Sequence, residues 1–386
     1  MAARQETSSR RTLRLCLGGD VMTGRGIDQI LAHPGDPGLR EAWVESALAY
    51  VRLAEAASGP VPKPVPDAYL WGDALDMLAA RAPELFIVNL ETSITTSADW
   101  EPKGINYRMH PANVGCLTAA GIDCCALANN HVLDWGRAGL RETLDVLDAA
   151  GIARTGAGRD AVAAWAPAVL AVPDKARVLV FAVGLESSGI PRDWAAGPRR
   201  PGVARLEALD AAAVARLAER IRAQRRPGDL VVVSIHWGGN WGYAIAAEQR
   251  AFARALVDTA GVDVVHGHSS HHPRGFEVHR GRPILYGCGD LINDYEGIRG
   301  YEGIPGYEEY RGDLGLLWFL DLDLEADRGR LAALTMAPLR RRRLRLERAE
   351  PEAAEWLRAV LERESRTGGV RVALGADGWL AADWPR

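Results

Sequence analysis

The chain has 386 residues, 48% of them hydrophobic, with 46 basic and 50 acidic side chains and a formal net charge of −4 at pH 7. This length and composition suit one large globular domain or two modest ones. The mildly acidic balance argues against a protein that binds nucleic acid through its overall charge. The sequence contains no run of about 18 apolar residues, so we expect no membrane-spanning segment.

The cysteines indicate a reducing environment. None lies in a C-x-x-C pair, and apolar residues flank all five: Cys16, Cys116, Cys124, Cys125 and Cys288. An odd number of such cysteines is typical of reduced, buried thiols. The N-terminal stretch MAARQETSSRRTLRLCLGGD carries charge but no apolar segment of signal-peptide length. We therefore expect a cytoplasmic protein.

Strands and helices alternate through the first half of the chain. Short apolar runs predict strands at residues 14–19, 85–91 and 123–128. Apolar residues at helical spacing predict helices near 27–31 and at 40–57, 73–84, 111–121 and 138–151. The Pro-rich stretch GPVPKPVP, residues 59–66, is too turn-prone for the core and predicts a loop.

The second half changes from alternating elements to hairpins. We expect strands at 164–172, 176–184, 229–235 and 262–265, with helices at 208–226 and 246–260. Hairpins follow at 275–287 and 314–339, then a helix at 351–365 and a last hairpin around Asp377 and Gly378. The basic run RRRRLRLER, residues 340–348, alternates Arg with Leu, which favours an edge strand with one solvated face over a nucleic-acid site.

This order of elements predicts the α/β class. Strands alternate with helices early and with other strands late, which favours a layered domain with mixed sheets over a doubly wound parallel sheet. We divide the chain into a main domain, residues 12–340, and a C-terminal helix and hairpin, residues 341–386, packed on it.

Polar residues follow the candidate strands at the point where each strand ends. They are Asp20, Asn89, Glu91, Asn130, His131, His236, His266, His268, His271 and His272. In open α/β sheets the carboxyl ends of strands converge on one crevice. Carboxylate, amide and imidazole donors without thiolate suit one or two divalent ions of borderline hardness, namely Mn, Fe or Zn.

Six motifs then resemble a known family. GGDVM, NLE, LANNHVLDWG, HWG, GHSSHHPRGFE and ILYGCGD, between about residues 13 and 300, are similar in type and order to those of the CapA family, which is named for poly-γ-glutamate capsule biosynthesis. That family looks like a branch of the calcineurin-like metallophosphoesterases. The resemblance implies a four-layer sandwich in which two mixed β-sheets pack face to face and helices flank them.

The resemblance also implies roles for the strand-end residues. Asp20 resembles the first carboxylate ligand, Glu91 the bridging carboxylate and Asn130 the amide ligand. The later metal ligands implied are His236, His268 and His271. We interpret the additional His266 and His272 as hydrogen-bond partners of ligands.

His131 resembles the histidine that protonates the leaving group or steadies the transition state. Asp134, three residues on, would hold that imidazole in its protonated form. A turn or helix-cap role for Asp134 is about equally well supported, and Asn129 is interpreted as structural.

Guanidinium groups bind phosphate or carboxylate through paired hydrogen bonds. Arg274, directly after the histidine cluster, is the first candidate to hold an anionic substrate, and Arg108 is the second. Cys288 and Asp290 receive no role, because the glycines of YGCGD indicate a turn.

Two departures from the phosphoesterase pattern affect the metal count. The first motif usually reads D-x-H, but here Met22 takes the third position, and a thioether is a poor ligand for such ions. The last motif is one residue longer than the usual G-H-x-H. The count is therefore one or two ions.

Three functions remain open. The first is a metal-dependent hydrolase that uses metal-activated water on a phosphoester. The alternative is an enzyme or accessory protein of poly-γ-glutamate or γ-glutamyl amide biosynthesis, and the third is a non-catalytic metal-binding scaffold. In each case we expect an anionic small molecule or polymer as the partner, and no nucleic acid.

Overall fold

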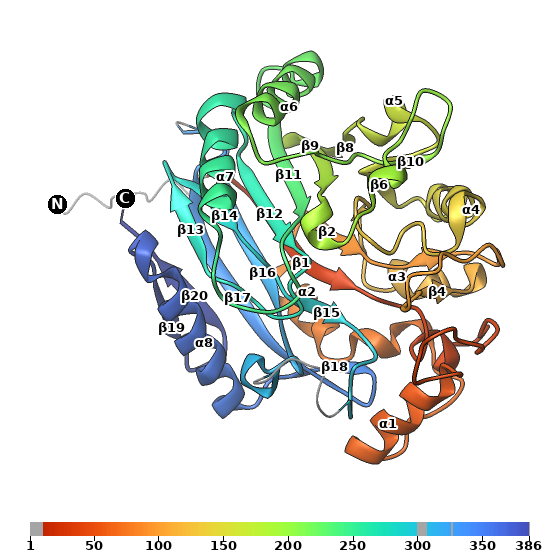
Figure 1. Cartoon of the computed structure of the whole chain (residues 1–386). Coiled ribbons are helices and arrows are strands. Elements are labelled where there is room, and N and C mark those ends of the chain that lie inside the picture. The colour runs from red at the N-terminus through yellow and green to blue at the C-terminus, as the bar shows by residue number, and fades with distance from the viewer. Residues whose placement is uncertain (1–10, 299–306, 326, 386) are drawn as a thin grey trace.

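The computed structural model describes residues 11–298, 307–325 and 327–385. It is a four-layer α/β sandwich, with two mixed β-sheets in the middle and helices on both outer faces (Figure 1). The fold class expected from the sequence is confirmed.

The first sheet has ten strands. They are β1 (Thr12–Val21), β2 (Leu85–Leu90), β5 (Cys124–Ala126), β6 (Ala153–Thr155), β15 (Asp290–Ile292), β16 (Leu314–Asp323), β17 (Leu331–Arg342), β18 (Arg345–Arg348), β19 (Arg371–Leu374) and β20 (Leu380–Asp383). The main order is β19-β20-β17-β16-β1-β2-β5-β6, with β15 beside β1 and β18 beside β17. β1, β2, β5, β6 and β15 run parallel, and the other pairings are antiparallel.

The second sheet has six strands in the order β13-β14-β12-β11-β9-β8. They are β8 (Ala168–Val172), β9 (Ala176–Gly184), β11 (Leu230–His236), β12 (Val264–His268), β13 (Phe276–His279) and β14 (Arg282–Leu285). Two short ladders lie outside the main sheets: β3 (Ser93–Ile94) with β4 (Arg108–Met109), and β7 (Ala157–Gly158) with β10 (Gly202–Val203).

Helices cover the outer face of each sheet. The first sheet packs against α1 (Leu48–Ser58), α2 (Ala74–Arg81), α3 (Gly115–Thr118) and α4 (Gly136–Ala149). The second packs against α6 (Ala211–Gln224) and α7 (Ala247–Ala260), with the short α5 (Ala161–Ala164) nearby. The α8 helix (Pro351–Ser365) lies beside β19 and contributes to the core between the sheets (Figure 1).

Alternation along β1 explains why the two sheets face each other. Leu13, Leu15 and Leu17 lie in the core between the sheets, whereas Cys16 lies in the core under the helices. Successive side chains of a strand point to opposite faces, so a strand that is apolar at every position is buried on both sides. Polar residues begin only where these buried strands end, and the strand ends lie at one edge of the sandwich.

The predicted helix at 40–57 is wrong in its first part, because α1 begins only at Leu48. Residues 38–47 fold back on themselves instead: the Leu39 amide donates to the Glu45 carbonyl, and the Ala47 amide donates to the Pro37 carbonyl. The Glu41 carboxylate also accepts a bond from the buried Arg25. These contacts give the backbone groups and the Glu41 side chain hydrogen-bond partners within the protein, which favours them over solvent-exposed helical turns.

Two other predicted helices are shorter than expected. Residues 111–121 form a 3-10 turn at Pro111–Asn113 followed by α3, and residues 27–31 form only the 3-10 turn Asp28–Ile30. Gly115 is the first residue of α3, and Gly121, just past its end, has a positive φ of 67°, which ends the helical path.

The C-terminal segment continues the main sheet, since β20 pairs with β17 and β19 pairs with β20. The boundary expected at residue 340 falls within β17, so the domain division stays a prediction. The basic run spans the β17–β18 hairpin, with its turn at Arg343 and Leu344. Within the described ranges, no helix is both long and apolar enough to cross a bilayer.

Candidate metal centre

The predicted strand-end residues meet at one edge of the sandwich. In the first sheet Asp20 lies opposite Asn89 of β2 and opposite Asp290 of β15, and in the second sheet His236 lies opposite His268. The sheets are joined here by a bond from the Ser269 amide to Asp20 Oδ2, at 3.2 Å. The β1–β2 and β11–β12 pairs are parallel, so Asp20, His236 and His268 lie at carboxyl ends on the same side, whereas Asp290 is the first residue of β15.

Two buried groups of side chains could hold a metal ion. In the first group, Asp20, His236 and His268 offer ligand atoms that all lie within 4.8 Å of one another. The two imidazoles approach most closely, with Nδ1 atoms 2.8 Å apart, and His268 Nδ1 lies 4.0 Å from Asp20 Oδ1. The second group consists of Asp20, His271 and Asp290, also within 4.8 Å.

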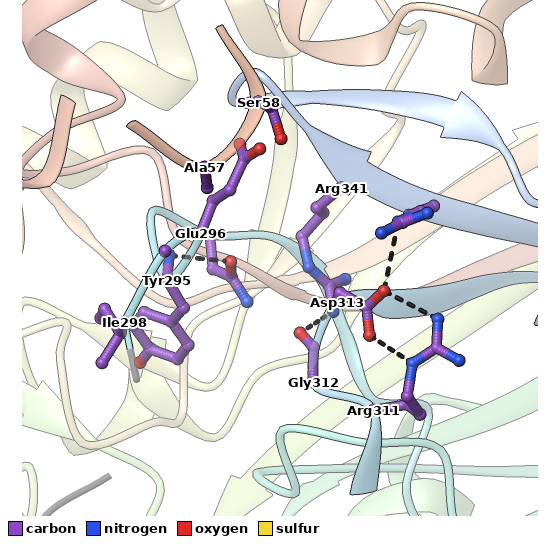
Figure 2. A pocket seen from close by; sticks show the side chains of 12 residues that line it. Ala57, Ser58, Tyr295, Glu296, Ile298, Arg311, Gly312, Asp313 and Arg341 are labelled. Atoms are coloured by element: carbon purple, nitrogen blue, oxygen red, sulfur yellow. Dashed lines mark hydrogen bonds and ion pairs between the residues drawn. The ribbon is translucent and has the colours of Figure 1, made fainter. Parts of the chain in front are cut away.

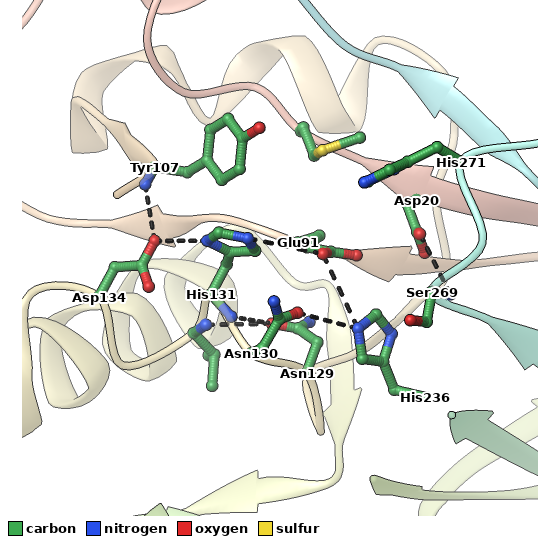
Figure 3. Close-up of polar contacts among 12 residues, drawn as sticks. Asp20, Glu91, Tyr107, Asn129, Asn130, His131, Asp134, His236, Ser269 and His271 are labelled. Carbon is green, nitrogen blue, oxygen red and sulfur yellow. Dashed lines mark hydrogen bonds and ion pairs between the residues drawn. The ribbon is translucent and has the colours of Figure 1, made fainter. Parts of the chain in front are cut away.

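Glu91 and Asn130 lie beside His236 of the first group (Figure 3). Glu91 Oε1 is 3.8 Å from the Nε2 atoms of both His131 and His236. Asn130 Oδ1 is 2.9 Å from His236 Nε2. The structure thus brings together all six residues predicted as metal ligands; their ligation itself stays a prediction.

Asn89 holds two of the carboxylates in place. Its amide nitrogen donates to Asp20 Oδ1 at 2.8 Å and to Glu91 Oε2 at 3.0 Å. Its oxygen accepts from Asn129, whose own oxygen accepts from the His131 amide at 3.1 Å. The structural role inferred for Asn129 agrees with these contacts. Asn89 orients the two carboxylates by donating a hydrogen bond to each.

The charges of the cluster fit a divalent cation. Burial raises the pKa of Asp20 and of Glu91, and the charge of Asp290 raises both further. Burial also lowers the pKa of His236 and His268 well below the usual value, so these imidazoles are neutral. Buried carboxylates beside neutral imidazoles are stabilised in their ionised form by a bound cation. The oxygen and nitrogen donors suit Mn, Fe or Zn.

His131 faces the cluster with one nitrogen and the protein with the other. Its Nδ1 lies 2.7 Å from Asp134 Oδ2, and its Nε2 is directed at Glu91 (Figure 3). Burial lowers the pKa of His131 to about 4, although Asp134 raises it. The expectation that Asp134 keeps the imidazole protonated is therefore not supported. The imidazole is neutral, and donation from Nδ1 to Asp134 leaves the Nε2 lone pair facing the centre.

Residues 14–295 match the family described as "Bacterial capsule synthesis protein PGA_cap". The chain belongs to this family, the CapA family. A Mycobacterium tuberculosis relative named "Probable polyglutamine synthesis accessory protein" is 49% identical over 366 residues, which span 94% of each chain. "Capsule biosynthesis protein CapA" of Bacillus anthracis is 27% identical over 73% of this chain and 60% of its own length. "PGA biosynthesis protein CapA" of Bacillus subtilis is 28% identical over 75% and 65%.

The CapA resemblance inferred from the six motifs is thus confirmed. The names of these relatives describe polymer or capsule synthesis and not phosphoester hydrolysis. They favour the biosynthetic alternative over the hydrolase hypothesis.

Lys103 is a site residue that the CapA motifs do not include. Its Nζ lies 2.7 Å from Asp134 Oδ1 and 3.3 Å from His131 Nδ1. The Tyr107 amide donates to Asp134 Oδ2 at 2.7 Å, and the Tyr107 ring packs edge-on against His131. The only signal in the sequence is rarity, because Lys63, Lys103 and Lys175 are the only lysines.

The two arginines proposed to bind substrate are engaged with the protein. The Arg274 guanidinium is buried and donates to the Gly239 carbonyl at 2.9 Å. Arg108 donates to the Ser97 carbonyl at 3.0 Å and lies over the Trp135 ring. These contacts stabilise loops, so they do not support a substrate-binding role for either arginine.

His266 and His272 differ in their surroundings. His266 Nε2 bonds the Gly18 carbonyl at 2.9 Å, while Ser234 Oγ lies within 3.1 Å of both His266 and His268. His266 therefore supports His268 through Ser234, as expected for a hydrogen-bond partner of a ligand. His272 instead stacks on Tyr310, with ring centroids 4.7 Å apart.

A cavity of about 350 Å³ opens beside the loop that follows Asp290 (Figure 2). Asn293 and Tyr295 line it on the side of the metal centre. Arg311 also lines it but is paired with Asp313 through two bonds of 2.8 and 2.9 Å. Arg340 and Arg341 line the cavity as well: Arg340 also pairs with Asp313, and Arg341 donates to the carbonyls of Asp290, Gly312 and Leu314.

Proposed function

We propose that this protein is a metal-dependent accessory enzyme in the synthesis of a polymer of glutamyl units. The M. tuberculosis relative, whose match spans 94% of both chains, is named for polyglutamine synthesis, and the B. subtilis relative is named for PGA biosynthesis; both names support a role in polymer synthesis. The observation that supports the metal-dependent part is the convergence of buried carboxylates and imidazoles from both sheets, with the partly buried Asn130 beside His236.

The proposed holders of one or two divalent ions are Asp20, Glu91, Asn130, His236, His268 and His271. Bound there, such ions polarise a carbonyl or phosphoryl oxygen and activate water at neutral pH.

The chain's own contribution to proton transfer comes from His131. With Nδ1 donating to Asp134, the neutral imidazole presents Nε2 to the centre, 3.8 Å from Glu91 Oε1. It accepts a proton from the attacking water and can return it to the leaving group. Asp134 and Lys103 orient the ring from its Nδ1 side, away from the centre.

Two classes of bond fit this chemistry. A γ-glutamyl amide is the bond that trimming or releasing a glutamate polymer would break, and it agrees with the poly-γ-glutamate for which the CapA family is named. A phosphoester is the second candidate, favoured by the Asn130–His131 pair, which resembles the corresponding pair of the metallophosphoesterases. Both substrates are anionic.

One assay separates the candidates. The protein with added Mn²⁺ is incubated in parallel with poly-γ-glutamate chains, γ-glutamyl peptides and aryl phosphate mono- and diesters, and released amine, shortened chains or phenol are measured. We expect amide cleavage that disappears in His131→Ala. Release of phenol without amide cleavage would identify the activity as phosphoester hydrolysis instead.

A second assay tests the polymer itself. Cells lacking the gene are complemented with the wild type, His131→Ala or the surface control His33→Ala, and cell-associated glutamate polymer is quantified. Polymer restored equally by all three would exclude a catalytic role and leave a metal-binding scaffold.

A further inference from the structure

Met22 leaves one position of the first motif without a suitable ligand. Its thioether sulphur accepts a hydrogen bond from the Tyr295 hydroxyl at 3.6 Å, and its side chain packs with Tyr107 and Tyr295 in a small apolar cluster. A sulphur held by a phenol among aromatic rings is not available as a ligand for a hard or borderline ion. If a second ion is bound on this side, another residue must complete its site.

Asp290 occupies the right place to do so. It lies opposite Asp20 across the parallel β1–β15 pair, so its side chain arises where β15 begins, next to the carboxyl end of β1. Asp290 Oδ1 is 2.9 Å from His271 Nδ1, and ligand atoms of Asp20, His271 and Asp290 all lie within 4.8 Å of one another. All three side chains are buried.

The surroundings of Asp290 fix the direction of its carboxylate. The side-chain nitrogen of Asn293 donates to Asp290 Oδ2 at 2.7 Å, which leaves Oδ1 directed toward His271. The Gly289 residue before it has a positive φ of 78°, and a Cβ there would lie 2.7 Å from the Pro273 backbone nitrogen. The tight turn predicted from YGCGD is therefore present, and it positions Asp290 beside Asp20 and His271.

We infer that Asp290 is a metal ligand that replaces the missing first-motif histidine, so that Asp20, His271 and Asp290 hold a second divalent ion. Asp20 is then shared with the ion held by His236 and His268. This inference rests on the metal dependence of the proposed function, but it is independent of which bond is cleaved. It makes the protein a two-ion protein despite Met22.

The competing role for Asp290 is to orient His271 by accepting a hydrogen bond from its Nδ1. Losing such a partner of a ligand typically weakens metal binding about 10–100-fold. The two roles differ in one respect: an orienting carboxylate acts only through His271, whereas a ligand acts on the ion directly.

The first measurement is the number of Mn²⁺ ions bound per chain, by equilibrium dialysis and elemental analysis in the absence of substrate. We expect two ions for the wild type and for the control Asp258→Asn, a carboxylate that pairs with His279 away from the centre. We expect one ion for Asp290→Ala and Asp290→Asn at the same free Mn²⁺. Thermal melting of each variant with Mn²⁺ checks that the fold is retained.

The second measurement is a double-mutant cycle on the dissociation constant of the weaker ion. If Asp290 is a ligand, Asp290→Ala weakens binding in the His271→Ala background as well as in the wild type. No further weakening in the His271→Ala background would overturn the inference, and so would a wild type that binds one ion. Loss of one ion in Asp290→Ala, together with polymer restored equally by His131→Ala and the wild type, would refute the proposed function and leave this metal site standing.

Discussion

Replacing Asp134 with asparagine tests the arrangement behind His131. The carboxylate is fully buried and accepts three bonds: Oδ2 from His131 Nδ1 and the Tyr107 amide, and Oδ1 from Lys103 Nζ, each at 2.7 Å. An amide has only one acceptor oxygen. It will keep the oxygen at the position with two donors, and its NH₂ group will then face the Lys103 ammonium.

The loss amounts to one charge-assisted hydrogen bond, worth about 1.5–3 kcal/mol. The Lys103 side chain is 24% exposed and can turn toward water, so we expect a stability loss near the lower end, about 1.5 kcal/mol. Asp134 also raises the pKa of His131, so asparagine weakens the imidazole as a proton acceptor. A loss of about 1.5–3 kcal/mol in the transition state corresponds to roughly a 10–100-fold lower turnover.

Urea denaturation followed by circular dichroism gives the stability, and turnover is measured with Mn²⁺ on the substrate identified above. The matched control is Asp148→Asn, because Asp148 is exposed and pairs with Arg154 away from the centre. We expect the control to change stability by less than about 0.5 kcal/mol. If Asp134→Asn behaves like this control in both measurements, the orienting role of Asp134 is refuted.

Three further outcomes are expected. Chelation of metal should lower the thermal midpoint, and Mn²⁺ at about 100 times its dissociation constant should restore about 2.7 kcal/mol per ion; a midpoint indifferent to both would exclude a metal site. Burial alone would raise the pKa of Glu277, but bonds from Arg254 and Tyr286 lower it, so the stability it contributes is present above the unfolded-state value and is lost as pH falls below about 4. Urea midpoints from pH 7 to pH 3 should therefore fall less steeply in Glu277→Gln than in the wild type, and parallel curves would contradict this. Trp318→Ala, in the fully buried core between the sheets, should cost about 3–5 kcal/mol, whereas Trp43→Ala, at a side chain 80% exposed, should cost less than about 0.5 kcal/mol in the same denaturation experiment.

The sequence determined the order of elements and the polar strand ends. An apolar run such as LFIVNL is buried on both faces, and its abrupt change to Glu91 marks the end of the strand in the chain itself. The same local signal identified Asp20 and His236. Periodicity and strand ends are properties of neighbouring residues, so they can be read without the fold.

Contacts between distant segments decided the rest. The helix expected at 40–57 was shortened because Arg25 and the backbone around Pro37 offer better partners to residues 38–47. Arg274 was assigned to substrate from its place after the histidines, but its guanidinium turns back to the loop at Gly239.

Tertiary structure alone also decided which residues meet at the centre and which protonation state His131 has. Asp290 reads as a turn residue in sequence and becomes part of the cluster only because β15 pairs with β1. Lys103 has no motif and reaches Asp134 from a separate loop. The protonation of His131 depends on how deeply the ring is buried, because burial outweighs the charge of Asp134, and burial is a property of the whole packed molecule.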